Sequence, residues 1–226
     1  MIEIINLSKS FGPKRILTDI NVRFESGMIY GIVGENGAGK TTFFRCIAEL
    51  EDYQGNIKCE ENDLKNNLGF LPSEPYFLPK ITGEEHVFLL TDARKIKVKN
   101  LSDRNIFRLP LKEYVSNYST GMKKKLGITS VLLQKNKYYI FDEPFNGIDL
   151  ESSILFSEIL KKLKELGKTI LISSHIFSTL KDSCDYIYKI EDGRFSRQFT
   201  QENFNELEDE MRHKILMKDI GKLLKD

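Results

Sequence analysis

A glycine-rich segment constrains this chain more than any other feature of its sequence. Residues 34–41 read GENGAGKT and match the pattern GxxxxGK[ST] at every position. The apolar run Met28–Val33 before it has the composition of a buried strand, and residues 41–50 after it have helical spacing. Glycines let backbone N–H groups turn toward phosphate oxygens, and the following helix presents its positive N-terminus to the same oxygens. The segment therefore predicts a phosphate-binding loop between a strand and a helix.

The end of this loop carries the side chains that a nucleoside triphosphate site needs. Lys40 is placed to reach the β- and γ-phosphates, and the Thr41 hydroxyl is placed to bind Mg²⁺. We expect ATP to be bound by the loop as a group: Gly34, Glu35, Asn36, Gly37, Ala38, Gly39, Lys40, Thr41 and Thr42. The pattern predicts that a nucleotide is bound and leaves open what is done with it.

A pair of carboxylates indicates the chemistry. The apolar run Tyr138–Phe141 predicts a second buried strand, and Asp142 and Glu143 follow directly at its carboxyl end. Open α/β sheets bind their ligands at the carboxyl ends of the strands. Asp142 can hold Mg²⁺ there, directly or through water. Glu143 is positioned to act as general base on a water that attacks the γ-phosphate.

Strand-like and helix-like segments alternate along the chain, which predicts a doubly wound, mostly parallel sheet. The strand-like runs lie at residues 2–7, 20–24, 28–33, 56–59, 138–141 and 169–173. A turn-like stretch, KSFGPKR, separates the first two. Residues 82–134 have helical, charged patterns, and residues 152–166 predict a helix that ends at Gly167.

Composition excludes several classes of protein. With 34 basic and 33 acidic residues the net charge is +1, which gives no electrostatic case for a nucleic-acid partner. Cys46, Cys59 and Cys184 lie far apart, so neither a disulfide framework nor a zinc site is indicated, and a reducing compartment is expected. No apolar run approaches 18 residues. We therefore expect a soluble chain, whose membrane part, if it serves a membrane process, lies in another protein.

Further segments resemble the nucleotide-binding domain of the ATP-binding cassette (ABC) transporters over roughly residues 2–198. FNGID, which ends at Asp149, is similar to the D-loop of this family, and the segment SSH ending at His175 to its switch histidine. YSTGMK, which contains Ser119 and Gly121, resembles its LSGGQ signature. Phe11 sits where the family places an aromatic side chain that stacks on adenine.

The resemblance implies a fold and a mechanism. The fold is an α/β P-loop NTPase: a mostly parallel sheet flanked by helices, with a small antiparallel β subdomain and a helical subdomain. Residues 1–226 would be a single ATP-binding domain, with a helical lobe at about 74–134 and a C-terminal helical tail at about 200–226. Two such domains dimerise head to tail, so that Ser119 and Gly121 serve the ATP site of the neighbouring subunit. His175 would contact the γ-phosphate, and Asp149 would lie at the nucleotide.

The resemblance also implies partners. We expect a separate transmembrane permease subunit and a second ATP-binding subunit, which is either an identical copy or a paralogue. The chain would then sit in the cytoplasm, peripheral on the inner face of the cell membrane. Its D-loop and signature look most like those of drug, bacteriocin or other small-molecule exporters.

Two positions depart from the family pattern. The segment LGFLPSEP resembles the Q-loop but has Ser73 where the family has glutamine. Serine is too short to reach Mg²⁺ and the attacking water together, so Ser73 acts through a water, Glu74 substitutes, or hydrolysis is slow. Met122 replaces the glutamine of the signature and removes a polar contact across the dimer. Both changes leave nucleotide binding intact and bear on the rate.

Other functions stay open beside the transporter hypothesis. Ser73 favours a nucleotide-gated regulatory module with slow turnover. A soluble ABC ATPase of translation or DNA repair would carry two cassettes or a long coiled-coil insertion, and this sequence has neither. The signature and His175 argue against a small-metabolite kinase.

Two further segments have alternative readings. Residues 76–78 either pack within the helical lobe or offer an apolar contact to a membrane subunit. The lysine triplet 123–125 is predicted to be a solvated helix face, with a role near lipid headgroups as the alternative.

Overall fold

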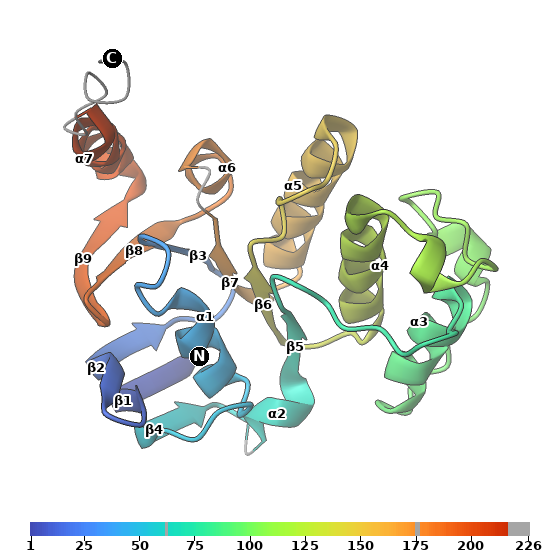
Figure 1. Ribbon diagram of the computed structural model, residues 1–226, viewed down its shortest axis with the longest axis horizontal. Coiled ribbons are helices and arrows are strands. Elements are labelled where there is room, and N and C mark those ends of the chain that lie inside the picture. The colour runs from blue at the N-terminus through green and yellow to red at the C-terminus, as the bar shows by residue number, and fades with distance from the viewer. Residues whose placement is uncertain (62, 175–176, 217–226) are drawn as a thin grey trace, which may run out of the picture.

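The computed structural model describes residues 1–61, 63–174 and 177–216. Its larger sheet, counted over these residues, has six strands in the spatial order β5 (Leu68–Leu71), β6 (Tyr138–Asp142), β7 (Thr169–Ser173), β3 (Ile29–Val33), β8 (Tyr186–Glu191) and β9 (Arg194–Thr200). Neighbouring strands are parallel except β9, which runs antiparallel to β8 (Figure 1). The predicted mostly parallel sheet is confirmed.

The core lies on both faces of this sheet. Every residue of β3, β6 and β7 is buried, as expected for parallel strands covered by helices on both sides. Along β6 the side chains alternate between two apolar clusters. Tyr139 and Phe141 pack into one, while Tyr138 and Ile140 pack into the other. The apolar runs therefore mark the central strands because these strands have no solvent-facing side.

A smaller antiparallel sheet has the order β2 (Lys14–Phe24), β1 (Ile2–Phe11) and β4 (Gln54–Cys59). It confirms the expected β subdomain. The turn-like stretch predicted between the first two strands is too long, however. Phe11 pairs directly with Lys14, so the turn consists of residues 12 and 13 alone. Ladder pairing extends both strands through polar residues that carry little strand signal of their own.

Helices flank the sheets (Figure 1). In chain order the described α-helices are α1 (Lys40–Ile47), α2 (Leu64–Asn67), α3 (Gly83–Asp92), α4 (Thr120–Leu133), α5 (Leu150–Glu165), α6 (Phe177–Lys181) and α7 (Phe204–Leu216). The described 3₁₀ turns are η1 (Leu101–Arg104), η2 (Val115–Asn117) and η3 (Gln201–Asn203). α3 and α4 form the helical lobe beside β5 and β6, on the side away from the antiparallel sheet.

The helical pattern predicted for residues 82–134 is wrong in its middle part. Between α3 and α4 the chain is irregular apart from η1 and η2. Lys95, Asn100 and Arg108 adopt positive φ angles there, which no α-helix contains. The charged residues of this stretch reflect its exposure to solvent and do not indicate a helix.

The sequence did not predict three of the described strands: β5, β8 and β9. β5 is four residues long and Pro72 follows it directly, so its strand signal is weak. β8 and β9 have mixed burial, since they lie toward the edge of the sheet. Short, half-polar runs give weak strand signals, and the pairing partners decide the outcome.

The C-terminal tail, as far as it is described, caps the fold. Phe204 and Leu207 of α7 are buried in the core. Arg197 of β9 pairs with Glu206 at 2.5 Å, and Lys189 of β8 pairs with Glu210 at 3.0 Å. The predicted helix is therefore present over α7; the rest of the predicted tail, 217–226, lies outside the described residues.

The sequence left open whether residues 76–78 pack within the helical lobe or offer an apolar contact to a partner. The structure divides them. Phe77 packs within the lobe, with its ring centroid 4.6 Å from that of His86. Tyr76 and Leu78 point outward and are 77% and 48% exposed. In the described part of the chain, no helix combines the length and apolar character needed to cross a bilayer.

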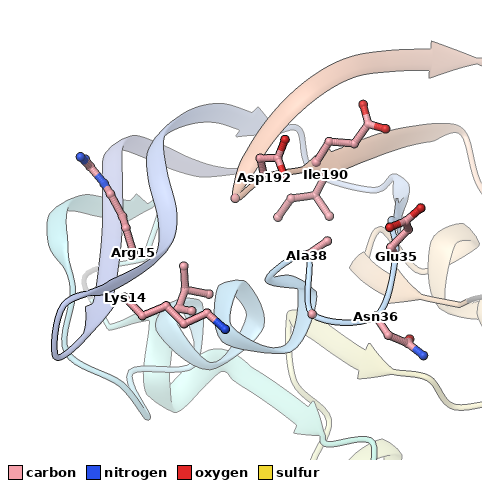
Figure 2. Close-up of a pocket in the computed structure, with 11 residues that line it drawn as sticks. Lys14, Arg15, Glu35, Asn36, Ala38, Ile190 and Asp192 are labelled. Carbon is pink, nitrogen blue, oxygen red and sulfur yellow. The ribbon is translucent and has the colours of Figure 1, made fainter.

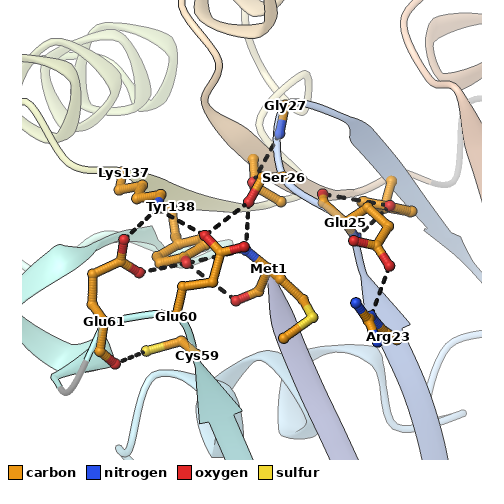
Figure 3. A network of polar contacts seen from close by, with 12 residues as sticks. Met1, Arg23, Glu25, Ser26, Gly27, Cys59, Glu60, Glu61, Lys137 and Tyr138 are labelled. Carbon is orange, nitrogen blue, oxygen red and sulfur yellow. Dashed lines mark hydrogen bonds and ion pairs between the residues drawn. The ribbon is translucent and has the colours of Figure 1, made fainter.

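A polar network joins the two sheets (Figure 3). Lys137, just before β6, pairs with Glu60 at 2.9 Å and with Glu61, both directly after β4. The Tyr138 hydroxyl donates to Glu61 at 2.5 Å. The hydrogen bond from Lys137, followed by that from the amino group of Met1, lowers the pKa of Glu60 from 4.5 to about 2.

This network predicts a loss of stability in acid. A carboxylate whose pKa is lowered by folding stabilises the folded state above its unfolded pKa, and the contribution disappears as the pH falls through the folded pKa. For Glu60 that window runs from 4.5 down to about 2. We expect Lys137→Met to lower the melting temperature at pH 7 and to differ progressively less from the wild type toward pH 2. Thermal unfolding followed by circular dichroism checks this, and a difference independent of pH would contradict it.

Candidate functional site

A cavity of about 400 Å³ lies where the loop after β3 meets the carboxyl end of β6. It is lined by Lys14, Ile16, Asn36, Gly37, Gly39, Lys40, Thr41, Thr42, Ser73, Asp142 and Glu143. The cavity thus collects residues from the glycine-rich loop, the predicted carboxylate pair and the Q-loop-like segment. It lies at the edge of the sheet where α/β folds bind ligands.

The glycine-rich loop runs from β3 into α1 as predicted. Gly39 precedes α1 with a φ of 109°, which side-chain-bearing residues rarely adopt, so glycine is required at this position. Among the described residues, no side chain caps the first turn of α1. The N–H groups of that turn are therefore available to an anion, and the helix dipole favours one.

The Lys40 ammonium lies over the beginning of the loop. It donates to the carbonyl oxygens of Gly34 at 2.7 Å and Glu35 at 3.2 Å, and the residue is 7% exposed. The lysine therefore already lies across the mouth of the loop, where a bound phosphate chain would meet it.

A hydrogen-bonded cluster surrounds Asp142, which is fully buried. Its two carboxylate oxygens accept hydrogen bonds from Thr41 Oγ1 at 2.7 Å and Ser173 Oγ at 2.6 Å. Parallel pairing places Asp142 of β6 opposite Ser173 of β7, and α1 brings Thr41 to the same point. A direct hydrogen bond thus joins Thr41 and Asp142, two of the three residues that the sequence nominated for Mg²⁺.

Glu143 lies beside this cluster in an unusual backbone conformation. Its φ is 50°, in the left-handed region, which costs a residue other than glycine about 1–3 kcal/mol. Its N–H donates to Ser173 Oγ at 2.9 Å. The turn after β6 thereby places Glu143 on the wall of the same cavity. Surrounding contacts must hold this conformation, because the backbone alone does not favour it.

A second cavity of about 580 Å³ adjoins the first (Figure 2). It shares Lys14, Ile16, Asn36 and Gly37 with the first cavity. Its remaining lining comes from Arg15, Glu35 and Ala38, from the end of β8 (Ile190 and Glu191), and from the β8–β9 turn (Asp192 and Gly193). Sequence reasoning missed Lys14 and Ile16, since they fell in or next to the stretch interpreted as a turn.

Phe11 lines neither cavity. Its ring is 48% exposed, and the Lys9 ammonium lies 4.6 Å from the ring centroid. The residue ends β1 next to the short turn that leads to Lys14. Its proposed contact with adenine therefore stays a prediction.

The signature-like residues lie at the start of α4 in the helical lobe, and they line neither cavity of their own chain. Ser119 caps the helix, with its hydroxyl accepting from the Met122 N–H at 3.2 Å. A Cβ atom at Gly121 would lie 2.5 Å from the carbonyl oxygen of Gly147, too close for any side chain. Glycine at this position therefore lets α4 approach the D-loop-like segment.

Asp149 has a structural role. It caps α5 by accepting from the Ser152 N–H at 2.8 Å, and it pairs with Lys125 at 3.0 Å. These two contacts, the Ser152 N–H first, hold the pKa of Asp149 well below its usual range. If Asp149 contacts the nucleotide as predicted, it has to do so while it caps α5.

The prediction that the lysine triplet forms a solvated helix face is wrong for Lys124. Lys124 is 3% exposed and points inward from α4. It donates to the carbonyl oxygen of Ser73 and, at 3.3 Å, to that of Glu143. Burial lowers the pKa of Lys124, and the nearby carboxylates of Asp142, Glu143 and Glu74 oppose this effect. An ordinary pattern of charged residues on a helix does not reveal which one turns inward.

His175 lies outside the described residues, so its predicted contact with the γ-phosphate stays a prediction. Ser174, directly before it, is buried at the carboxyl end of β7.

The loop between β3 and α1, together with the buried aspartate on β6, defines a P-loop nucleoside triphosphatase. A match to the family model described as ABC transporter, over residues 17–146, narrows this class further. The chain belongs to the ATP-binding proteins of ABC transporters, and it is accordingly an ABC transporter ATPase.

Several curated proteins are similar along most of the chain. It is 33% identical to the ABC transporter ATP-binding protein NatA of Bacillus subtilis, over 85% of this chain and 87% of NatA. It is 30% identical to the lantibiotic transport ATP-binding protein SrtF of Streptococcus pyogenes, over 96% and 98% of the two chains. The bacitracin transport ATP-binding protein BcrA of Enterococcus faecalis is 32% identical, over 85% of this chain and 67% of BcrA.

Two solved structures share the fold. An ATP-binding subunit of an ABC transporter superposes with a TM-score of 0.80 and 26% identity, covering 92% of this chain and 93% of that chain. The ATP-binding cassette MJ0796, a dimer bound to ADP and Pi, gives a TM-score of 0.79 at 20% identity, covering 89% and 99%. The predicted fold class, including the small antiparallel sheet, is thereby confirmed.

Proposed function

We propose that this ATPase works as a head-to-tail dimer that powers export through a separate transmembrane permease. The observation that carries the proposal is the separation of Ser119 and Gly121 from the cavities of their own chain. Both residues lie at the N-terminus of α4, a position suited to an anion, yet they line neither cavity. A second ATP-binding subunit, either identical or a paralogue, would bring its α4 to this chain's phosphate loop. The dimeric state of MJ0796 supports this arrangement.

Mg²⁺ fits the oxygen donors at the loop. The Thr41 hydroxyl and the Asp142 carboxylate meet at 2.7 Å, and Ser73 lines the same cavity. Within the described ranges, no group of three or more histidine, cysteine or acidic side chains could hold a metal. An ion held mainly by nucleotide phosphates needs only one or two protein ligands. When bound, Mg²⁺ would neutralise charge on the β- and γ-phosphates.

The chain's own residues divide the work of hydrolysis in this proposal. Lys40 binds the β- and γ-phosphates, and the N–H groups of α1 hold the phosphate oxygens. Glu143 takes the proton of the attacking water. His175 orients the γ-phosphate and Phe11 stacks on adenine, as the family resemblance suggests. We infer that residues 1–226 act as a single ATP-binding domain.

The permease has to come from another chain in this proposal. Tyr76 and Leu78 are exposed beside the helical lobe and offer it an apolar contact. The protein would then lie on the cytoplasmic face of the membrane. SrtF is a lantibiotic transport protein and BcrA a bacitracin transport protein, and this favours an antibiotic of that kind as the exported substrate.

A slow, nucleotide-gated regulatory module is the second candidate. The observation that favours it is the position of Ser73 on the cavity wall, where the family has glutamine. Wild-type turnover no faster than that of Glu143→Gln would select this function over active transport.

Complementation between two inactive variants tests the head-to-tail arrangement. Ser119→Arg blocks the signature, while Lys40→Met disables the phosphate loop. Mixed dimers keep one intact composite site, formed by Lys40 of one subunit and Ser119 of the other. We expect an equimolar mixture to regain roughly a quarter of wild-type turnover, because half of the dimers are mixed and each has one of two sites.

The control is each variant alone, assayed for ATP hydrolysis after circular dichroism has shown that it is folded. Loss of the Ser119 cap costs about 1 kcal/mol, which a helix with this many buried residues should tolerate. A mixture as inactive as its components, beside an active wild type, would argue against shared sites.

A further inference from the structure

Lys124 connects two walls of the phosphate cavity from behind. It projects from α4, and its amine donates to the carbonyl oxygens of Ser73 and Glu143. Ser73 and Glu143 both line the cavity, while Lys124 does not. These two carbonyls belong to segments that lie 70 positions apart in the sequence, and the Lys124 side chain links them.

Glu143 depends on such contacts more than an ordinary residue does. Its left-handed φ of 50° is held at the N–H by Ser173. Its carbonyl oxygen accepts hydrogen bonds from Lys124 and from the Asn146 N–H, each at 3.3 Å. Strained conformations persist only where the surroundings over-determine them. Without Lys124, the carbonyl of Glu143 loses a side-chain donor, and the direction in which the residue leaves β6 becomes less fixed.

The same helix begins at the signature. Ser119 caps α4 five positions before Lys124, which is about 7.5 Å along the helix axis. Helix α4 is well packed, with Leu126, Ile128 and Val131 buried, so it moves as a unit. A displacement of its N-terminus is therefore transmitted to Ser73 and Glu143 through one side chain.

We propose that Lys124 is a positioning residue that fixes Glu143 and Ser73 relative to the signature helix, and that it thereby sets the rate of hydrolysis. This inference rests on the proposed function, in which Glu143 is the base and α4 closes over the ATP of a neighbouring subunit. Lys124 does not line the cavity in which the nucleotide and the attacking water would lie. Loss of Lys124 is therefore expected to lower kcat and to leave the affinity for ATP unchanged.

The test replaces Lys124 with methionine, which keeps an unbranched apolar stem and removes the donor. We expect kcat to fall by about 10–100-fold, as for a misplaced catalytic group, while the Kd for ATP changes by less than about 3-fold. Lys124→Arg, which can still donate to both carbonyls, is expected to recover most of the loss. Lys161→Met, on the exposed surface of α5, is the matched control and should behave as the wild type.

Unchanged kcat in Lys124→Met overturns the proposal, as does a parallel loss of ATP binding and turnover. If the methionine variant does not fold, Lys124→Gln is judged by the same criteria, since its shorter side chain cannot span both carbonyls. Wild-type protein and Glu143→Gln are assayed in the same series. Equal turnover of those two refutes the proposed function itself, whereas a difference between them with normal Lys124→Met refutes only the role of Lys124.

Discussion

Glu143→Gln is expected to lower the kcat for ATP hydrolysis by about 10²–10⁴-fold, the usual contribution of a general base. The amide cannot accept the proton of the attacking water, yet it has the same shape and keeps the backbone contacts with Ser173 and Lys124. The Kd for ATP should therefore stay within about 3-fold of the wild type. Bound ATP would persist, and an ATP-dependent dimer should accumulate. Steady-state ATPase assays and size-exclusion chromatography with ATP measure the two effects.

Glu151→Gln is the matched control for this substitution. Glu151 lies in the first turn of α5, is exposed to solvent and does not line the cavity. It should turn over ATP at the wild-type rate. If the wild type hydrolyses ATP well above background and Glu143→Gln does so equally fast, Glu143 is not the base. Glu74→Gln is worth measuring beside it, because Glu74 follows the unusual Ser73.

Lys40→Met is expected to weaken ATP binding by roughly 10–100-fold, because a hydrogen bond to a charged group contributes about 1.5–3 kcal/mol and 1.4 kcal/mol is a factor of ten. Methionine keeps the buried stem but loses the ammonium that now lies on the carbonyls of Gly34 and Glu35. Turnover should fall at least as far. Isothermal titration calorimetry with ATP measures the affinity.

Lys161→Met again provides the control, since it removes an exposed lysine from α5. Melting temperatures without nucleotide separate loss of binding from loss of folding. If Lys40→Met bound ATP with the wild-type Kd, the phosphate chain would have to lie elsewhere than along this loop.

Much of the fold could be read from the sequence because its strongest signals are local. The runs before Gly34 and Asp142 are apolar throughout, and only strands covered on both faces tolerate this. The exceptions lie where partners decide the structure. Strands β8 and β9 form because β3 offers an edge to β8, and no pattern within either segment records that edge.

The residues of the candidate site also fall into two groups: those that local spacing identified and those that only the tertiary structure places at the cavity. Lys40, Thr41, Asp142 and Glu143 were identified from spacing, and the structure gathers them around one cavity. Lys14 and Ile16 were missed, because they reach the cavity only through the pairing of β2 with β1. Ser119, Gly121 and Asp149 lie away from that cavity, and the two that cap helices have a local role in addition to the one the family resemblance suggests.

The sequence by itself determined the chemistry of this protein: a phosphate loop, a carboxylate pair and the order of the segments around them. These follow from residue types at fixed spacing, and the spacing within one turn or one strand end is a local property. Only the tertiary structure decided that Lys124 turns inward while its neighbours do not, and that Glu143 is held in a strained conformation. The physical reason is that carbonyl oxygens from two distant segments lie beside that point of α4. A charged side chain is buried at a tolerable cost only where such hydrogen-bond partners are present.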